Sequence, residues 1–319
     1  MENSVNVNQK TFLGHPMGLF ILFFTELWER FSYYGMRAIL VLYLVSETSG
    51  DNPGMGWSDS SALALYGWYT MFVYLATIPG GILADRYLGQ RKSVMLGGLL
   101  LCFGHGILAL EALWAFYTGL VFIVLGVGCL KGNISTMVGG LYGKDDHNKR
   151  DMGFYIFYMG INIGAAVSAL LVGYVGEVYN WHYGFGLAGI GMAIGQIGYW
   201  KGQKYLTHVG NLIKLEPNKE DKSDNLFLQI FKKTNSLVGF SVTALIGLFI
   251  GYSGSWDYGL LFIGIAFAVG FAIVVYNDGN KIEKDRILVT YLAFLIVIVF
   301  WGAFEQAGGL MNLYASQKT

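Results

Sequence analysis

The chain has 319 residues, 54% of them hydrophobic and 13% charged, with a mean hydropathy of +0.48 and a formal net charge of zero. Soluble domains carry about 25% charged residues, so this composition excludes an ordinary soluble protein, and the zero net charge argues against a nucleic-acid partner. The five His and two Cys residues are scattered without metal-ligand or disulfide spacing, which argues against a metalloenzyme. The high hydropathy and low charge indicate an integral membrane protein.

Apolar stretches long enough to cross a bilayer, about 20 residues each, occur nine times along the chain. Helices are expected, because lipid satisfies no backbone polar group and the strict alternation of a membrane β-barrel is absent. The predicted fold class is therefore an all-α polytopic membrane protein. The predicted spans are 17–46, 61–84, 92–111, 113–138, 152–178, 184–203, 236–253, 256–276 and 287–311.

Lys and Arg residues alternate between the segments that connect these spans. Seventeen of the 21 basic residues fall at the N-terminus and in every second connection, whereas the connections between them have none. Cytoplasmic loops carry this excess, so the pattern predicts a multi-pass protein of the cell (inner) membrane with a cytoplasmic N-terminus.

A polar segment separates the first six spans from the rest and divides the chain into predicted domains. Residues 1–203 form an N-terminal six-helix transmembrane bundle, and 204–235 form a cytoplasmic linker. Residues 236–284 form an inserted transmembrane helix pair, and 285–319 form the first helix of an incomplete C-terminal bundle. We expect a chain truncated after its seventh core helix, or a fragment, that would not transport unaided, because alternating access needs two bundles.

Ionisable residues gather on one face of the first span. Six polar or charged side chains recur there at helical spacing. Inserting a charged side chain at the centre of a membrane helix costs on the order of 3 kcal/mol. A helix that only anchored the chain would therefore not carry the four ionisable residues found here. An internal salt-bridge cluster that pins helices together is the alternative to a functional site. The six residues are Glu26, Glu29, Arg30, Tyr33, Tyr34 and Arg37.

Other polar residues lie within later spans. Lys131 lies well inside span four, although its side chain could also extend to the interface. Glu305 falls in the last span or at its outer boundary, and these two residues would balance the charges of span one. Asn162 could contact a ligand or a neighbouring helix, and Tyr69 could face substrate or pack.

Four segments of the sequence resemble motifs of a known transporter family. The segment Glu26–Gly35 resembles the ExxERFxYYG signature of the proton-dependent oligopeptide transporter (POT/PTR) family of the major facilitator superfamily. Gly80–Arg91 is similar to the superfamily's loop between helices two and three, Phe154–Gly164 to the family's second signature, and Phe300–Gln306 to its FWxxFEQ pattern. The two spans at 236–276 resemble the helix pair inserted between bundles in bacterial members.

The resemblance implies the roles of individual residues in a peptide:proton symporter. Arg37 and Lys131 would bind the carboxylate of a di- or tripeptide, and Glu305 would hold its amino end with Trp301 nearby. Glu26 and Glu29 would take the proton and pair with Arg30 and Lys131 when ionised. The rest of the binding wall would comprise Tyr33, Tyr34, Tyr69 and Asn162, and the cytoplasmic gate or latch would comprise Asp85, Arg86 and Arg91.

The chemistry of buried charges agrees with this expectation. Burial raises a carboxylate's affinity for protons and a neighbouring cation lowers it, so moving a lysine between substrate and glutamate would couple the two binding events. One proton crossing 100 mV supplies about 2.3 kcal/mol, roughly a fifty-fold accumulation. No cofactor is expected beyond the coupling proton, and the full-length protein is expected to be monomeric. The alternatives to the peptide symporter are a same-fold carrier of another small solute such as nitrate, and a non-transporting receptor or fragment. The sequence favours a membrane enzyme least, because it contains no set of nucleophile, base and metal ligands.

Overall fold

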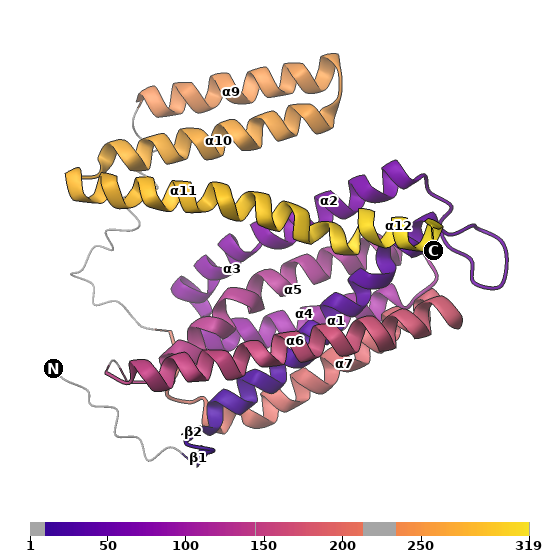
Figure 1. The fold of residues 1–319 in the computed structure, drawn as a ribbon, viewed down its shortest axis with the longest axis horizontal. Helices are drawn as coiled ribbons and strands as arrows, with labels where there is room; N and C mark the ends of the chain where they lie inside the picture. The colour runs from indigo at the N-terminus through magenta and orange to yellow at the C-terminus, as the bar shows by residue number, and fades with distance from the viewer. Residues whose placement is uncertain (1–9, 144, 213–233, 319) are drawn as a thin grey trace. The chain divides into compact units, whose positions relative to one another are not determined.

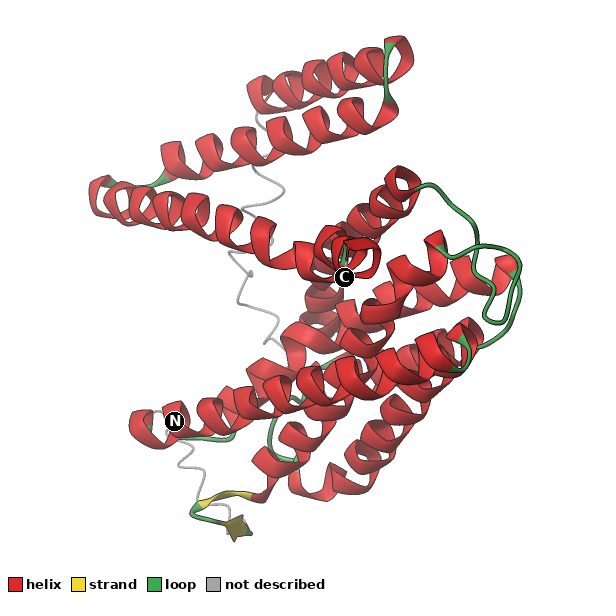
Figure 2. Cartoon of the chain, turned by 45° about the vertical axis from the view of Figure 1, so that its right-hand side comes forward, coloured by secondary structure: helices red, strands yellow, loops and turns green. Residues whose placement is uncertain are grey.

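The computed structural model describes residues 10–143, 145–212 and 234–318. The chain divides into two compact units, residues 1–213 together with 305–319, and residues 214–304. Much of the predicted linker at 204–235 lies outside the described residues. Figure 2 shows that the described chain is almost entirely helical, as an all-α fold requires.

The first unit is a bundle of helices that pack side by side (Figure 1). Its elements lie close to the predicted spans, with most ends moved by a few residues. Its helices are α1 (Met17–Val45), α2 (Asp59–Leu75), α3 (Thr77–Leu83), a π-helix η1 (Ala84–Leu88), α4 (Gln90–Leu108), α5 (Leu113–Gly140), α6 (His147–Val178), α7 (Trp181–Gly202), η2 (Gln203–Tyr205), η3 (Glu305–Gly308) and α12 (Leu310–Lys318).

Helix α1 lies at the centre of the bundle and packs against α6 and α7. The packing depends on glycines where backbones meet. A Cβ at Gly164 of α6 would overlap the carbonyl oxygen of Leu27, and one at Gly80 of α3 would overlap that of Gly128 on α5. Small residues at such points let the backbones approach, which brings α1 close enough to its neighbours to bury its charged face.

The second predicted span is broken rather than continuous. Helix α2 ends at Leu75, α3 begins at Thr77, and the π-helix carries the run to Leu88. Pro79 follows the break, and its ring nitrogen has no hydrogen to donate to the carbonyl of Leu75. The missing donor accounts for the interruption within one apolar stretch.

A short β-hairpin precedes α1 and was not predicted. Strands β1 (Thr11–Phe12) and β2 (His15–Pro16) pair antiparallel, with Phe12 opposite His15. Leu13 and Gly14 form the turn, both with positive φ. Two residues per strand leave too short a pattern for sequence periodicity to reveal.

The loop between α1 and α2 is folded back onto the bundle. The side chain of Asn52 donates to the carbonyl oxygen of Gly176 at 2.8 Å and accepts from the backbone N–H of Trp181 at 3.1 Å. The indole nitrogen of Trp181 donates to the Asn52 carbonyl at 3.1 Å. These bonds fasten the loop to the turn that joins α6 and α7.

The second unit consists of α9 (Thr234–Ser253), α10 (Trp256–Asp278) and α11 (Lys281–Phe304). Helices α9 and α10 form an antiparallel pair in which the rings of Phe240 and Phe267 lie 4.8 Å apart. The last span was predicted to begin at residue 287, but α11 begins at Lys281. Asn280 and Glu283 exchange side-chain-to-backbone hydrogen bonds of 2.8 and 3.0 Å, a capping box that starts the helix earlier.

Five helical runs in the described residues are long and apolar enough to cross a membrane. Helix α1 is not among them, because every 18-residue window of it contains at least three of Glu26, Glu29, Arg30 and Arg37. The charges that make α1 a candidate site are therefore also the reason that it fails a strict hydropathy criterion for a membrane span. The five runs are Asp59–Leu88, Leu113–Gly140, His147–Val178, Tyr258–Asn277 and Lys281–Gly308.

Candidate functional site

Three charged side chains from the middle of α1 form a buried group. Nε of Arg30 lies 2.8 Å from Oε1 of Glu26 and 2.7 Å from Oε2 of Glu29. Glu29 is fully buried, and Glu26 and Arg30 are each 3% exposed. One cation thus serves two carboxylates inside the bundle, with α6 against it at Gly164, where a Cβ would come within 3.1 Å of the Cβ of Arg30.

Several polar atoms of this group make no hydrogen bond within the described part of the chain. They are Oε2 of Glu26, both carboxylate oxygens of Glu29 and Nη2 of Arg30. Buried polar groups are normally hydrogen-bonded, so atoms left in this state call for an explanation. Oε2 of Glu29 has only its ion-pair contact with Arg30, which Glu26 shares, so two negative charges face one guanidinium.

A second ion pair lies further along the same helix. Nη2 of Arg37 is 2.7 Å from Oε2 of Glu305, and the Arg37 side chain is 5% exposed against 16% for Glu305. Nη2 also donates to the Glu305 carbonyl oxygen at 3.1 Å, and Nε donates to the hydroxyl of Tyr66. That hydroxyl in turn donates to the Glu305 carbonyl at 3.0 Å. The pair therefore joins α1, α2 and the C-terminal segment.

Tyr74 links this pair to Lys131. Its hydroxyl donates to Oε1 of Glu305 at 2.8 Å, and the ammonium nitrogen of Lys131 lies 4.2 Å from the centre of its ring. No carboxylate among the described residues lies within ion-pair distance of Lys131. The expected pairing of Lys131 with a glutamate therefore stays a prediction. The ring face holds the cation instead, as in cation–π contacts elsewhere.

The predicted tyrosines differ in their surroundings. Tyr33 and Tyr34 stack edge to face at 5.5 Å, and the Arg30 guanidinium lies 5.9 and 6.0 Å from their ring centres. The Arg37 guanidinium is 5.7 Å from Tyr34, so this ring contacts both cations. Tyr69 is buried, and its hydroxyl has no hydrogen-bond partner in the described part of the chain.

Two other residues predicted for peptide binding make contacts within their own helices. The amide of Asn162 is exposed on α6 and donates to the carbonyl of Tyr158 in its own helix at 3.1 Å. Trp301 belongs to α11 of the second unit, where its ring contacts those of Phe300 and Phe304 at 5.7 and 5.1 Å. Their contact with a ligand stays a prediction.

The predicted gate residues lie around the start of α4. Asp85 and Arg86 are exposed on the π-helix η1. The backbone of Arg91 is anchored from two sides: its N–H donates to the Gly210 carbonyl at 2.9 Å, and its carbonyl accepts from the hydroxyl of Tyr199 at 2.9 Å. The structure thus holds Arg91 through its backbone, and a gating role for all three stays a prediction.

Sequence reasoning missed Tyr66 and Tyr74, although both contact Glu305 in the structure. They are eight residues apart on α2, which is two helical turns and one face. Tyr69 was singled out instead, and it lies three residues from Tyr66 near the same face. The spacing could have identified the pair, but only the structure shows that this face meets the C-terminal segment.

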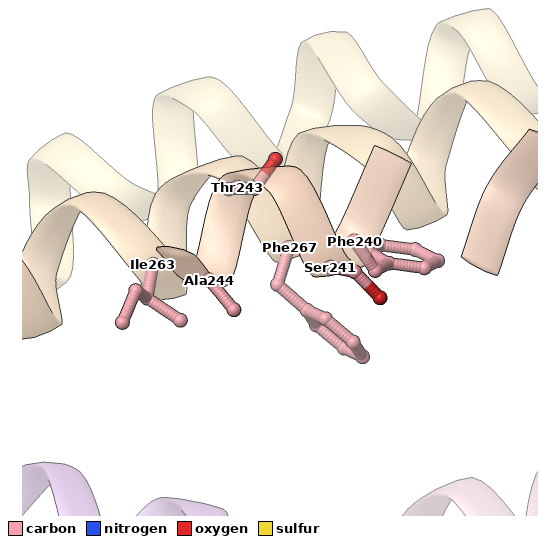
Figure 3. A pocket seen from close by; sticks show the side chains of 6 residues that line it. All are labelled: Phe240, Ser241, Thr243, Ala244, Ile263 and Phe267. Carbon is pink, nitrogen blue, oxygen red and sulfur yellow. The ribbon is translucent and has the colours of Figure 1, made fainter. Parts of the chain in front are cut away.

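A separate small cavity lies on the helix pair of the second unit (Figure 3). None of the six residues that line it is ionisable. In the described ranges, no three His, Cys, Asp or Glu side chains gather as metal ligands would. The cavity is lined by Phe240, Ser241, Thr243, Ala244, Ile263 and Phe267.

Comparison with known proteins finds relatives of this chain both by sequence and by fold. A di-/tripeptide transporter of Lactococcus lactis subsp. cremoris is 40% identical over 333 residues, which cover 100% of this chain and 64% of the relative. A crystal structure of a peptide transporter POT in complex with sulfate matches with TM-score 0.76 and 36% identity, covering 98% of this chain and 63% of that one.

A crystal structure of a POT family transporter in complex with a thioalcohol-conjugated peptide matches with TM-score 0.78 and 32% identity, over 98% of this chain and 64% of that one. The chain therefore spans less than two thirds of the length of the relatives that it matches. The family model described as the POT family matches residues 91–319, well over half of the chain. On this evidence, the chain belongs to the POT family and has the helical fold of a major facilitator transporter.

Proposed function

We propose that the protein is a proton-coupled symporter that imports di- and tripeptides by alternating access. It is a carrier and not an enzyme, with the proton as coupling ion and no other cofactor. The observation that supports this most directly is that two buried arginines of one helix, α1, each hold carboxylates. Arg30 forms ion pairs with Glu26 and Glu29, and Arg37 forms an ion pair with Glu305.

The Arg37–Glu305 pair has the polarity that a zwitterionic peptide needs. A peptide carboxylate would replace Glu305 at the guanidinium, and a peptide ammonium would replace Arg37 at the carboxylate. Each pole exchanges one partner of opposite charge for another, so neither charge is left unpaired within the protein. The tyrosine hydroxyls of Tyr66 and Tyr74 remain to orient Glu305 during the exchange.

The Glu26–Arg30–Glu29 group suits the proton step. A proton taken by Glu29 leaves one carboxylate to one guanidinium, a neutral pair. When the proton departs, the second negative charge again needs a cation. Lys131 has no carboxylate partner in the described structure and could supply that charge. Glu26 and Arg37 are 11 residues apart, about 16 Å along the helix, so the two charge groups occupy separate levels of α1.

We further propose that the protein resides in the cell (inner) membrane with its N-terminus in the cytoplasm, and that it works as a monomer. The alternation of Lys and Arg supports this orientation. Helix α1 begins at the cytoplasmic side under this orientation, so the Arg37–Glu305 pair lies in its outer half. The pair would then close the outer side of the site until a peptide replaces it.

Uptake of a labelled dipeptide into proteoliposomes that contain the full-length protein, with and without an inward proton gradient, tests the proposal. We expect uptake to exceed equilibrium only with the gradient, and we expect unlabelled di- and tripeptides to compete for it. Flux that ignores the gradient would refute proton coupling. Competition by nitrate or another small anion, and not by peptides, would assign the same fold a different solute.

A further inference from the structure

Two large apolar side chains are exposed at the tip of the β1–β2 hairpin. Phe12 is 51% exposed and Leu13 is 75% exposed. Leu13 has φ of 49° in a two-residue turn with Gly14, a backbone region that favours Gly, Asn or Asp. A branched apolar residue is a poor choice for such a turn on conformational grounds. An environment outside the hairpin must therefore favour Leu13 at this position.

The hairpin is fixed to the bundle rather than extended from it. The N–H of Met17 donates to the carbonyl of Lys10 at 2.9 Å, which closes the hairpin onto the start of α1. Nδ1 of His15 lies 2.8 Å from the hydroxyl of Tyr142, which follows the end of α5. The ring of Phe12 packs edge to face on that of Phe20, in the first turn of α1, with centroids 5.0 Å apart. These contacts hold the tip in one position relative to the span.

Chain connectivity places this tip at the membrane boundary. Helix α1 begins at Met17, directly after Pro16, so Leu13 is four residues from the start of a spanning helix. The Phe12–Phe20 contact makes the apolar surface of the hairpin continuous with that of α1. Lys10 is exposed at the base of the hairpin, and Lys201 and Lys204 are exposed where α7 ends. A Cβ at Gly202 would overlap the side chain of Ile21, so α7 ends beside the first turns of α1.

We propose that the hairpin, residues 10–16, is an interfacial anchor that inserts Phe12 and Leu13 into the phospholipid leaflet at the start of α1. Apolar side chains bound in this way lie about 5–10 Å into the boundary between headgroups and acyl chains. Lys10 then lies among the headgroups, where anionic lipid attracts it. The anchor fixes the level of α1 in the bilayer independently of the charged groups further along the helix.

Site-directed spin labelling tests the position of the tip. A nitroxide is attached to Leu13→Cys in a Cys102→Ala, Cys129→Ala background, in nanodiscs of phosphatidylcholine and phosphatidylglycerol. Relaxation by oxygen is compared with relaxation by a water-soluble nickel chelate. Val121→Cys, on the exposed face of α5, is the lipid reference, and Asn148→Cys, exposed at the start of α6, is the water reference.

We expect the label at Leu13 to be relaxed more by oxygen than by the nickel chelate, as at Val121. Nickel accessibility equal to that at Asn148 would overturn the proposal. A second measurement tests the attachment of the hairpin. Adding His15→Ala removes the bond to Tyr142, and we expect the Leu13 spectrum to sharpen as the label gains mobility. An unchanged spectrum would show that His15 does not hold the tip in the leaflet.

Discussion

Replacing Glu305 by glutamine tests the ion pair that joins α1 to the C-terminal segment. The substitution keeps the shape of the side chain and one carbonyl oxygen, but it removes the charge that faces Arg37. The Arg37 guanidinium retains the Tyr66 hydroxyl and the backbone carbonyl of residue 305 as acceptors. Tyr74 retains an oxygen to which it can donate. The perturbation is therefore confined to the ionic part of the contact.

The expected loss of stability follows from the burial of the pair. Removing one partner of a buried ion pair costs about 3–5 kcal/mol, because the other charge is left uncompensated. The Glu305 side chain is 16% exposed, and glutamine still accepts a hydrogen bond, so the cost is reduced to that of a charge-assisted bond. Such a bond contributes about 1.5–3 kcal/mol. For a domain of about 150–250 residues, the size range of the first unit, 1 kcal/mol lowers Tm by about 2–4 °C, so we expect a decrease of about 3–12 °C.

Thermal unfolding in detergent micelles measures the effect, with Glu111→Gln as the control at an exposed carboxylate. The double variant Arg37→Gln, Glu305→Gln completes a mutant cycle. Residues in direct contact couple by about 0.5–3 kcal/mol, so we expect the double variant to lose less stability than the two single variants together. A decrease no larger than that of Glu111→Gln, together with additive effects in the cycle, would refute the argument.

Three further predictions follow from the same geometry. Glu29→Gln should retain peptide counterflow but lose accumulation driven by a proton gradient, because an amide takes up no proton; unchanged accumulation in proteoliposomes would contradict this. Tyr74→Phe should weaken peptide binding by about 0.5–1.5 kcal/mol, because it loses one hydrogen bond to Glu305 but keeps the ring that faces Lys131. Tyr74→Leu should weaken binding further, because it also loses the ring. Equal dissociation constants for the two variants would count against the ring contact. Gly80→Ala should reduce the yield of folded protein because its Cβ would meet a backbone carbonyl, while Gly67→Ala, which faces open space, should not; size-exclusion profiles that do not distinguish them would refute the close approach.

The ends of the elements show where sequence patterns stop being informative. The predicted start of the last span at residue 287 was late because polar residues at 281–286 obscure a helix that a capping box begins. The single span predicted at 61–84 is broken at Ala76, where one missing donor outweighs a continuous apolar pattern. Two-residue strands at 11–16 are too short to carry any period. In each case a local hydrogen bond, rather than hydropathy, decides the boundary.

The candidate site was predictable in its composition but not in its pairing. The face of α1 is visible in the sequence, because residues at spacings of three and four lie together on a helix whatever surrounds it. The pairing of Arg30 with Glu26 follows from their spacing of four residues, whereas Glu29 is the direct sequence neighbour of Arg30 and only the structure shows that the two side chains meet. The contact of Arg37 with Glu305 joins residues 268 positions apart, and helical periodicity contains no information about it.

The sequence by itself therefore determined an all-α membrane protein, the approximate positions of its long helices and the charged face of its first helix, because the cost of burying charge and backbone in lipid acts on each segment separately. The tertiary structure decided which partners those charges have. It brought Tyr66 and Tyr74 to Glu305 and the Tyr74 ring to Lys131, through helices that pack at glycines. Such contacts depend on how helices meet in space, and that is fixed by the shapes of whole surfaces rather than by any one segment.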